Sequence, residues 1–268
     1  MIPGDHSIPK FHFPNGRPYT SLEIEEKIKK IKSEFEKLPA KCILSKLEMT
    51  RITKACDVPL YWKEPIRLAI LAARPSNGNN QNVVNNQNAV NNQNQNPTAS
   101  TLNLNEITDP NKITCNEFLD FWKKLLASSF DESCRFVKLL TKGERNYLVH
   151  DDFIAMIQDV VESHPGLQFL KDAVEFHSRY VHTVIARIFY CVNKSWSGKI
   201  SIPELRKSNF LSVVSALEEE DDINQITDYF SYEHFYVIYC KFWELDKDHD
   251  LIIDKHDLSK HNDGSKLI

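Results

Sequence analysis

The sequence predicts an all-α fold built from repeated helix–loop–helix units, preceded by an N-terminal helical region. Apolar residues recur at steps of three and four along most of the chain, which is the spacing of amphipathic helices. One short phrase also recurs four times, with an apolar residue, an acid four positions later and a second apolar residue directly after the acid. Such repetition predicts repeated structural units. The four copies lie at 112–118, 147–153, 199–205 and 251–258.

Each copy matches the second half of a twelve-residue EF-hand calcium loop that runs into its exiting helix. The fullest match is loop 246–257, where aspartates stand at positions 1, 3, 5, 9 and 12 and the residue at position 7 offers a backbone carbonyl. Calcium is a hard cation that takes six to eight oxygen ligands, so this pattern predicts a calcium site. The predicted metal ligands are Asp246, Asp248, Asp250, Ile252, Asp254 and Asp257.

Two residues of loop 246–257 depart from the usual pattern. Leu251 stands at position 6, where glycine is expected, and a side chain at positive φ costs about 1–2 kcal/mol. Asp257 is one methylene shorter than the usual glutamate, which weakens calcium and leaves room for magnesium to compete. The alternative interpretation is a solvated acidic turn between two helices, and the regular spacing of five carboxylates argues against it.

The other three loops have lost most ligands. Loops 106–117 and 141–152 start about 35 residues apart, a natural distance for a pair of EF-hands, and we expect them to keep the fold without the metal. Loop 193–204 keeps Gly198 at position 6 and Glu204 at position 12, but its other ligands are neutral. Its low charge predicts a low calcium affinity.

The N-terminal part of the chain divides into an arm and a helical region. Residues 1–19 hold so many prolines that we expect an extended arm, which Phe11 and Phe13 anchor to its own domain or to a partner. Residues 20–74 form the helical region, and the capping box from Thr20 to Glu23 predicts its first helix, which ends near Leu38.

Within this region a second helix is expected over 43–56, with Leu44 and Leu47 among its inward-facing residues. Two prolines then frame Tyr61 and Trp62. This aromatic pair is interpreted as a buried plug between helices, with a docking surface as the alternative.

The remaining organisation follows from composition and periodicity. Residues 75–104 are an Asn/Gln tract with few large apolar groups, which predicts a disordered insert. Residues 105–166 are expected to hold the degenerate EF-hand-like pair. Residues 167–268 then form an EF-hand region, which begins with a long helix over 167–192 and contains loops 193–204 and 246–257.

Composition excludes several classes of function. The formal net charge is −4, which gives no basic footprint for nucleic acid, and no segment approaches the ~20 apolar residues that span a membrane. Six scattered cysteines and no secretion signal predict a reducing compartment, the cytoplasm or the nucleus. Because the common nucleotide-binding, hydrolase and metalloprotease motifs are absent, the chain is interpreted as a non-catalytic calcium-binding protein.

Four long segments resemble the B″ family of regulatory subunits of protein phosphatase 2A, and the member group with the 72 and 130 kDa forms is the most similar. They are IPKFHFPNGRP, CDVPLYWKEP, the stretch from SHPGLQF to SGKIS, and the stretch from INQITDYF to KHND. The resemblance implies a subunit that docks on the scaffold subunit, contacts the catalytic subunit and directs the enzyme to phosphoprotein substrates. It also implies that calcium modulates this assembly.

The resemblance extends to loop 246–257, since the family pattern D-x-D-x-D-L-x-I-D also has leucine at position 6. Family members continue past this loop into a second, glycine-containing EF-hand, so we expect this chain to be a fragment or a shortened form. Two alternatives stay open. One is a stand-alone calcium sensor or buffer, against which the low count of three methionines argues, because sensors expose Met-rich grooves. The other is an enzyme whose site carries no recognisable motif.

Overall fold

The computed structural model describes residues 18–75 and 109–259, and over these ranges it confirms the all-α fold. Most of the expected arm, most of the Asn/Gln insert and the last nine residues lie outside the described ranges. The α-helices are α1 (Ser21–Glu36), α2 (Lys46–Ala55), α3 (Lys63–Ala72), α4 (Cys115–Ser128), α5 (Glu132–Leu140), α6 (His150–Ser163), α7 (Val174–Val192), α8 (Ile202–Lys207), α9 (Phe210–Ala216), α10 (Tyr232–Leu245) and α11 (Lys255–Ser259). The short 3₁₀ helices are η2 (Leu60–Trp62), η3 (Pro165–Asp172) and η4 (Ile223–Gln225).

Four two-residue strands join the helix–loop–helix units in pairs. They are β1 (Cys42–Ile43), β2 (Ile113–Thr114), β3 (Tyr147–Leu148) and β4 (Ile200–Ser201). β1 pairs antiparallel with β2, and β3 pairs antiparallel with β4. We call the units joined by β1 and β2 the N-terminal pair, and those joined by β3 and β4 the C-terminal pair.

The expected pairing of loop 106–117 with loop 141–152 is therefore wrong. Loop 106–117 pairs with the unit that precedes it in the chain, and Ile113 lies opposite Ile43. The repeated phrase does not reveal that unit. In the other three units, the helix cap comes directly after the buried strand residue. In this unit Leu44 stands between Ile43 and the helix cap Ser45, so the four-residue spacing to the acid is lost.

Side-chain caps fix where several helices begin. Thr20 forms a capping box with Glu23 at the start of α1, as predicted, and Ser45 forms one with Glu48 at the start of α2. Because α2 starts at Lys46 rather than at residue 43, the prediction that Leu44 and Leu47 face inward is wrong. Both side chains are exposed, and Leu47 keeps 73% of its accessible surface.

The predicted long helix over 167–192 is also divided. η3 ends at Asp172, and Ala173 takes a non-helical conformation with φ −110° and ψ 69° before α7 begins. The buried-plug interpretation of Tyr61 and Trp62 is confirmed, since both side chains are almost fully buried and the Trp62 ring lies 5.3 Å from that of Phe136.

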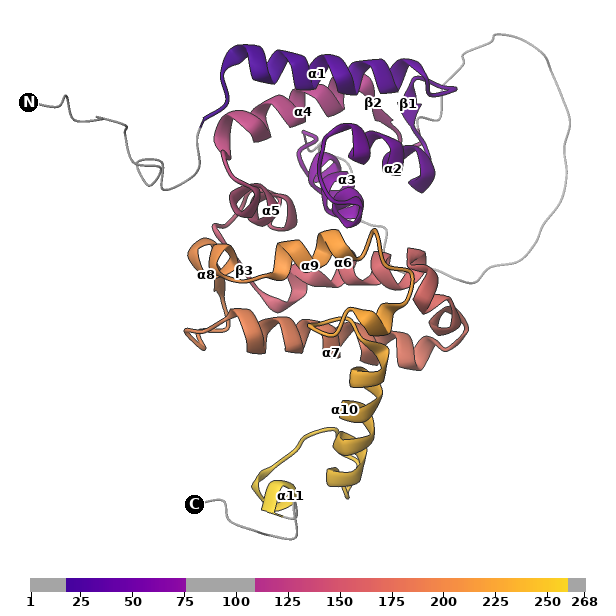
Figure 1. Cartoon of the computed structure of the whole chain (residues 1–268), viewed down its shortest axis with the longest axis vertical. Helices are drawn as coiled ribbons and strands as arrows, with labels where there is room; N and C mark the ends of the chain where they lie inside the picture. Colours follow the sequence, from indigo (N-terminus) through magenta and orange to yellow (C-terminus); the bar gives the residue numbers. More distant parts are fainter. Residues whose placement is uncertain (1–17, 76–108, 260–268) are drawn as a thin grey trace, which may run out of the picture.

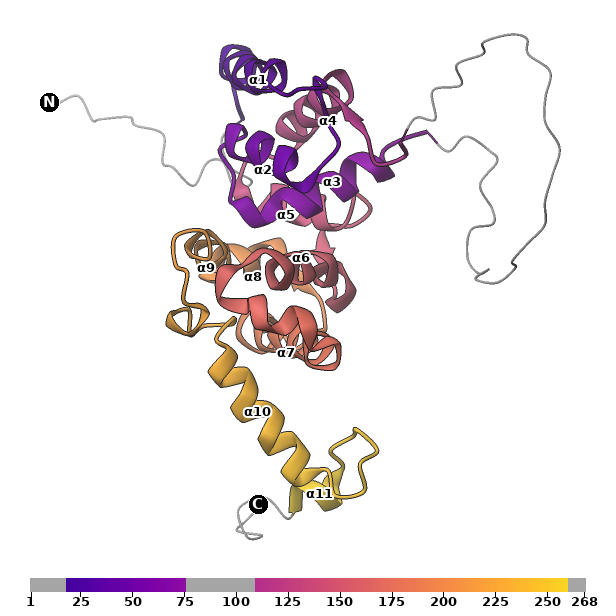
Figure 2. The same cartoon turned by 90° about the vertical axis from the view of Figure 1, so that its right-hand side faces the viewer.

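Figures 1 and 2 show the N-terminal pair stacked on the C-terminal pair, with α10 projecting away from both. One continuous cluster of buried apolar side chains runs through the two pairs, and α3 packs against both α5 and α6. No helix within the described ranges is long and apolar enough to cross a membrane.

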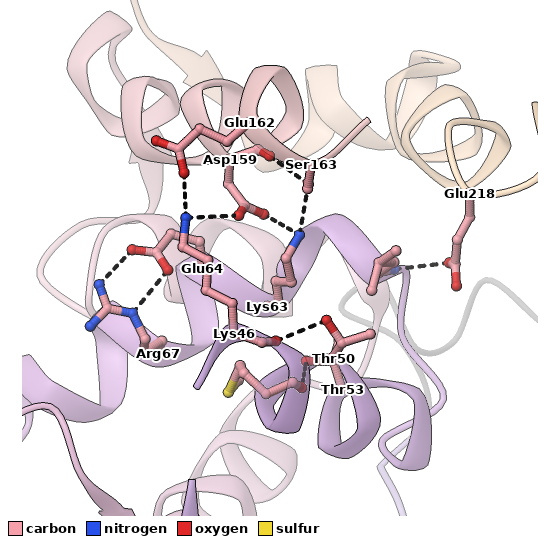
Figure 3. Close-up of polar contacts among 12 residues, drawn as sticks. Lys46, Thr50, Thr53, Lys63, Glu64, Arg67, Asp159, Glu162, Ser163 and Glu218 are labelled. Carbon is pink, nitrogen blue, oxygen red and sulfur yellow. Dashed lines mark hydrogen bonds and ion pairs between the residues drawn. The ribbon is translucent and has the colours of Figure 1, made fainter. Parts of the chain in front are cut away.

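A buried ion pair fastens the two pairs together (Figure 3). Lys63, at the start of α3, contacts the carboxylate of Asp159 in α6, and the two residues are only 4% and 2% exposed. The Lys63 amine also donates to the hydroxyl of Ser163 at 3.2 Å. Lys46 contacts Glu162 from the surface side, with its amine 3.7 Å from Asp159. Polar groups this deeply buried require partners, so the ion pair fixes how α3 sits on α6.

Candidate metal centre

The predicted calcium loop lies at the far end of α10, between that helix and α11 (Figure 2). The first half of α10 is anchored in the core, where the Phe235 ring packs edge-on against Tyr180 at 5.4 Å. Further along, Tyr239 packs against Phe176 of α7 at 5.2 Å. The helix then leaves the core, and the loop begins at its last turn with Asp246.

The structure brings three of the predicted ligands together. Carboxylate oxygens of Asp246, Asp248 and Asp250 all lie within 4.8 Å of one another. Asp246 is fully buried, whereas the other two are exposed. Three converging carboxylate oxygens are the donor type that calcium prefers, and without a cation they repel one another.

The sharp turn of the loop forms without glycine. Leu251 has a φ of 66° and His249 a φ of 60°, so both are in the left-handed region. The two carboxylate oxygens of Asp246 accept the backbone N–H groups of Asp250 and Leu251 at 3.2 and 3.1 Å. The Trp243 ring stacks on His249 at 4.3 Å. These contacts offset the ~1–2 kcal/mol that a side chain costs at positive φ.

The other three predicted ligands do not lie in this carboxylate group. Asp254 accepts the backbone N–H of Asp257 at 2.8 Å, and Asp257 accepts that of Asp254 at 3.3 Å, so the two acids cap α11. The bond from Asp257 holds the pKa of Asp254 below its usual value. Ile252 donates its N–H to Asp250 at 2.7 Å.

This loop also lacks a paired strand, in contrast to the loops of the two pairs. Within the described residues no strand forms at Ile253, the position that corresponds to Ile113, Leu148 and Ile200. The loop is therefore held by α10 and by its own hydrogen bonds rather than by a partner loop.

Sequence reasoning missed two arginines that contact the degenerate loops. Arg145, at position 5 of loop 141–152, forms an ion pair with Asp152 at position 12. Arg74 forms one with Glu117, at position 12 of loop 106–117. A basic residue at a ligand position was a visible signal for Arg145. Arg74 lies 43 residues from Glu117, and nothing in the sequence connects the two.

Comparison with known proteins gives two matches to family models. Residues 131–220 match a model described as an EF-hand domain, and residues 30–81 match one described as the P2R3B EF-hand. EF-hand domains bind calcium as a class. Loop 246–257 lies outside both matched ranges.

Curated relatives match almost the whole chain. It is 46% identical over 96% of its length to the human B″ beta regulatory subunit of protein phosphatase 2A, and 47% identical over 96% to the human B″ alpha regulatory subunit. It is 43% identical over 98% of its length to the mouse B″ delta regulatory subunit. The chain covers 38%, 19% and 46% of these relatives, so it spans less than half of each. A solved chain from a PP2A PR70 holoenzyme is 67% identical, with 50% of each chain covered and a TM-score of 0.48.

Proposed function

Since the chain belongs to the B″ family of protein phosphatase 2A regulatory subunits, we propose that it is a non-catalytic regulatory subunit of that phosphatase. In this role it docks on the scaffold subunit, contacts the catalytic subunit and directs the enzyme to phosphoprotein substrates. The observation that carries the proposal is the 43–47% identity to named regulatory subunits over nearly the whole chain.

The proposal includes a calcium ion at loop 246–257. Its support is the convergence of Asp246, Asp248 and Asp250 and the left-handed turn at Leu251. The proposed ligand set also includes the backbone carbonyl of Ile252 and the carboxylates of Asp254 and Asp257. A bound cation would neutralise the repulsion among the clustered carboxylates and so order the loop at the end of α10.

The cytoplasm and the nucleus are the proposed locations. All six cysteines of the chain lie within the described residues and none forms a disulfide. Free thiols of this kind persist in a reducing compartment.

We assign the scaffold subunit to an exposed apolar face of α10, made of Tyr236, Val237, Cys240 and Trp243. Cys240 lies four positions after Tyr236, three after Val237 and three before Trp243, so the four side chains share one side of the helix. About half of the exposed large apolar side chains in the described residues lie on α10 and the loop after it. A concentration of apolar side chains on a projecting helix is typical of a protein-binding surface.

The proposed function is tested by binding this chain to purified phosphatase scaffold and catalytic subunits, in calcium and in chelator. Binding to the scaffold in either condition supports the regulatory role, and stronger binding in calcium places the control at loop 246–257. Binding in neither condition contradicts the proposal for this length of chain.

Val237→Asp is expected to weaken scaffold binding about tenfold or more, because a charge would be buried in the centre of an apolar contact. Scaffold affinity is measured by surface plasmon resonance. Leu47→Asp is the matched control, since it makes a similar change at an exposed site on α2, away from α10. Equal scaffold affinity of the two variants would contradict the assignment of this face.

A stand-alone calcium sensor is less consistent with the structure. Sensors expose a flexible Met-rich groove when calcium binds. Met49 and Met156, the methionines within the described residues, are both buried in the core. Calcium binding without any scaffold binding would favour the sensor in place of the regulatory role.

A further inference from the structure

Loops 106–117, 141–152 and 193–204, which have lost most of their calcium ligands, share one feature. In each of them a nitrogen donor of the chain itself contacts the acid at position 12. The donors are Asn193 in loop 193–204, Arg145 in loop 141–152 and Arg74 beside loop 106–117. In a calcium-loaded EF-hand, the acid at position 12 binds the metal instead.

Asn193 shows the replacement most completely. Its side-chain amide nitrogen donates toward the Lys199 carbonyl at 2.9 Å and the Ser195 hydroxyl at 3.0 Å. The Glu204 carboxylate and the Ser197 hydroxyl lie at 3.2 and 3.3 Å from the same nitrogen. These four oxygens belong to positions 7, 3, 12 and 5, which are ligand positions of an EF-hand. The amide nitrogen therefore lies among the oxygen atoms that would surround the cation.

The hydrogen bonds fix the orientation of this amide. The backbone N–H of Gly198 donates to the Asn193 side-chain oxygen at 2.9 Å. If the amide turned over, its N–H₂ group would face the Gly198 N–H and its oxygen would face the Lys199 carbonyl, so two bonds would be lost. An aspartate at position 1 has two oxygens and serves both the glycine N–H and the metal. Asparagine has one oxygen, which is already committed to Gly198.

Glu204 is also fully engaged within loop 193–204. One carboxylate oxygen accepts the backbone N–H of Ser195 at 3.0 Å, and the other accepts the N–H and hydroxyl of Ser201 at 2.9 and 2.7 Å. Burial alone would raise the pKa of Glu204, but these hydrogen bonds outweigh it and lower the pKa to about 2. The carboxylate is thus stabilised as an anion by the chain itself.

The arginines fill the same role in the other two loops. The Arg74 guanidinium contacts both Glu117 oxygens at 2.6 and 3.2 Å and the Lys112 carbonyl, at position 7, at 2.5 Å. It also donates to the carbonyl of Pro110, at position 5. Arg145 contacts both oxygens of Asp152 at 2.7 and 3.2 Å. Arginine keeps its charge at any physiological pH, so these replacements are permanent.

We propose that nitrogen donors of the chain replace the calcium ion in these three loops, so that each of them is calcium-independent. The residues present do not fit the metal that the EF-hand class implies. The charge of loop 193–204 agrees with this, since that loop carries two lysines and one acid, whereas loop 246–257 carries five aspartates and two lysines.

Asn193→Asp is expected to open a calcium site in loop 193–204, because it restores the second oxygen at position 1 and removes the amide donor. Calcium calorimetry on the full chain should count one more equivalent for this variant than for the unchanged chain. With so few charged ligands, the new site should bind weakly, at a Kd of about 10⁻⁴–10⁻³ M. The expected result is a difference of one calcium equivalent between the variant and the unchanged chain, so the test applies whether or not loop 246–257 binds calcium.

Trp196→Asp is the matched control, because it adds a negative charge to the same loop at position 4, which is not a ligand position, and should add no equivalent. In the unchanged chain, the Gly198 amide resonance should not move when calcium is added. Calcium binding to the unchanged loop 193–204, seen as a shift of that resonance, would overturn the proposal. A folded Asn193→Asp variant, judged by its circular dichroism, that gained no equivalent would also overturn it.

Discussion

Replacing Lys63 with methionine is expected to lower the free energy of unfolding by about 3–5 kcal/mol, the usual cost of leaving one member of a buried ion pair without its partner. Lys63 and Asp159 lie between the two EF-hand pairs and are almost fully buried (Figure 3). Methionine preserves most of the side-chain volume, so the loss measures the unpaired Asp159 carboxylate rather than a cavity. Urea denaturation at pH 7 gives the value.

The loss in free energy of unfolding caused by Lys63→Met should depend on pH in a defined direction. Burial raises the pKa of Asp159 above its usual value, although Lys63 and Lys46 oppose the shift. A carboxyl group whose pKa is higher in the folded state stabilises the fold as it becomes protonated. Without Lys63 this pKa should rise further, so the deficit is largest at neutral pH and shrinks as the pH falls and Asp159 takes up a proton.

Two further variants make the ion-pair prediction specific. Lys46→Met applies the same change to a largely exposed lysine next to the pair, and should cost less than about 1 kcal/mol. The double variant Lys63→Met with Asp159→Leu removes both charges and should regain most of the lost stability. If Lys63→Met cost no more than Lys46→Met, the buried pair would not be what holds α3 on α6.

Asp246→Ala is expected to lower calcium affinity at loop 246–257 by about 100-fold or more. The change removes a proposed ligand and, at the same time, the carboxylate that accepts the N–H groups of Asp250 and Leu251. Both the charge of the site and the shape of its turn are then lost. Calcium calorimetry on the full chain measures the effect.

Two comparisons separate the loss of the ligand from other effects of the Asp246 change. Asp248→Ala removes an exposed carboxylate of the same group and should weaken calcium at least about tenfold, because one formal charge of the site is lost. Asp120→Ala makes the same replacement on the exposed side of α4 and should leave calcium affinity unchanged. Unchanged affinity in the Asp246 and Asp248 variants would show that the ligands were wrongly assigned.

Features decided over a few neighbouring residues could be predicted from the sequence. The start of α1 follows from the hydrogen bonds between Thr20 and Glu23, which lie three positions apart. The clustering of Asp246, Asp248 and Asp250 and the positive φ at Leu251 follow from the twelve-residue loop itself. The contacts are local, so the spacing of residues contains the information.

The order in which the EF-hand units pair could not be read in the same way. Ile43 lies opposite Ile113, 70 residues away, and one extra residue hides the unit to which Ile43 belongs. The exposure of Leu44 and Leu47 depends on the same arrangement, because it is set by where α2 begins and by what packs over it.

The sequence by itself determined the all-α fold, the local caps and the one loop with a full set of carboxylates, since each depends on short-range spacing. Tertiary structure alone decided which groups stand in place of calcium at loop 106–117 and what joins the two pairs. Arg74 meets Glu117, and Lys63 meets Asp159, only after distant helices have packed together. A buried charge must find its partner wherever the fold brings one within reach, and sequence spacing does not record that distance.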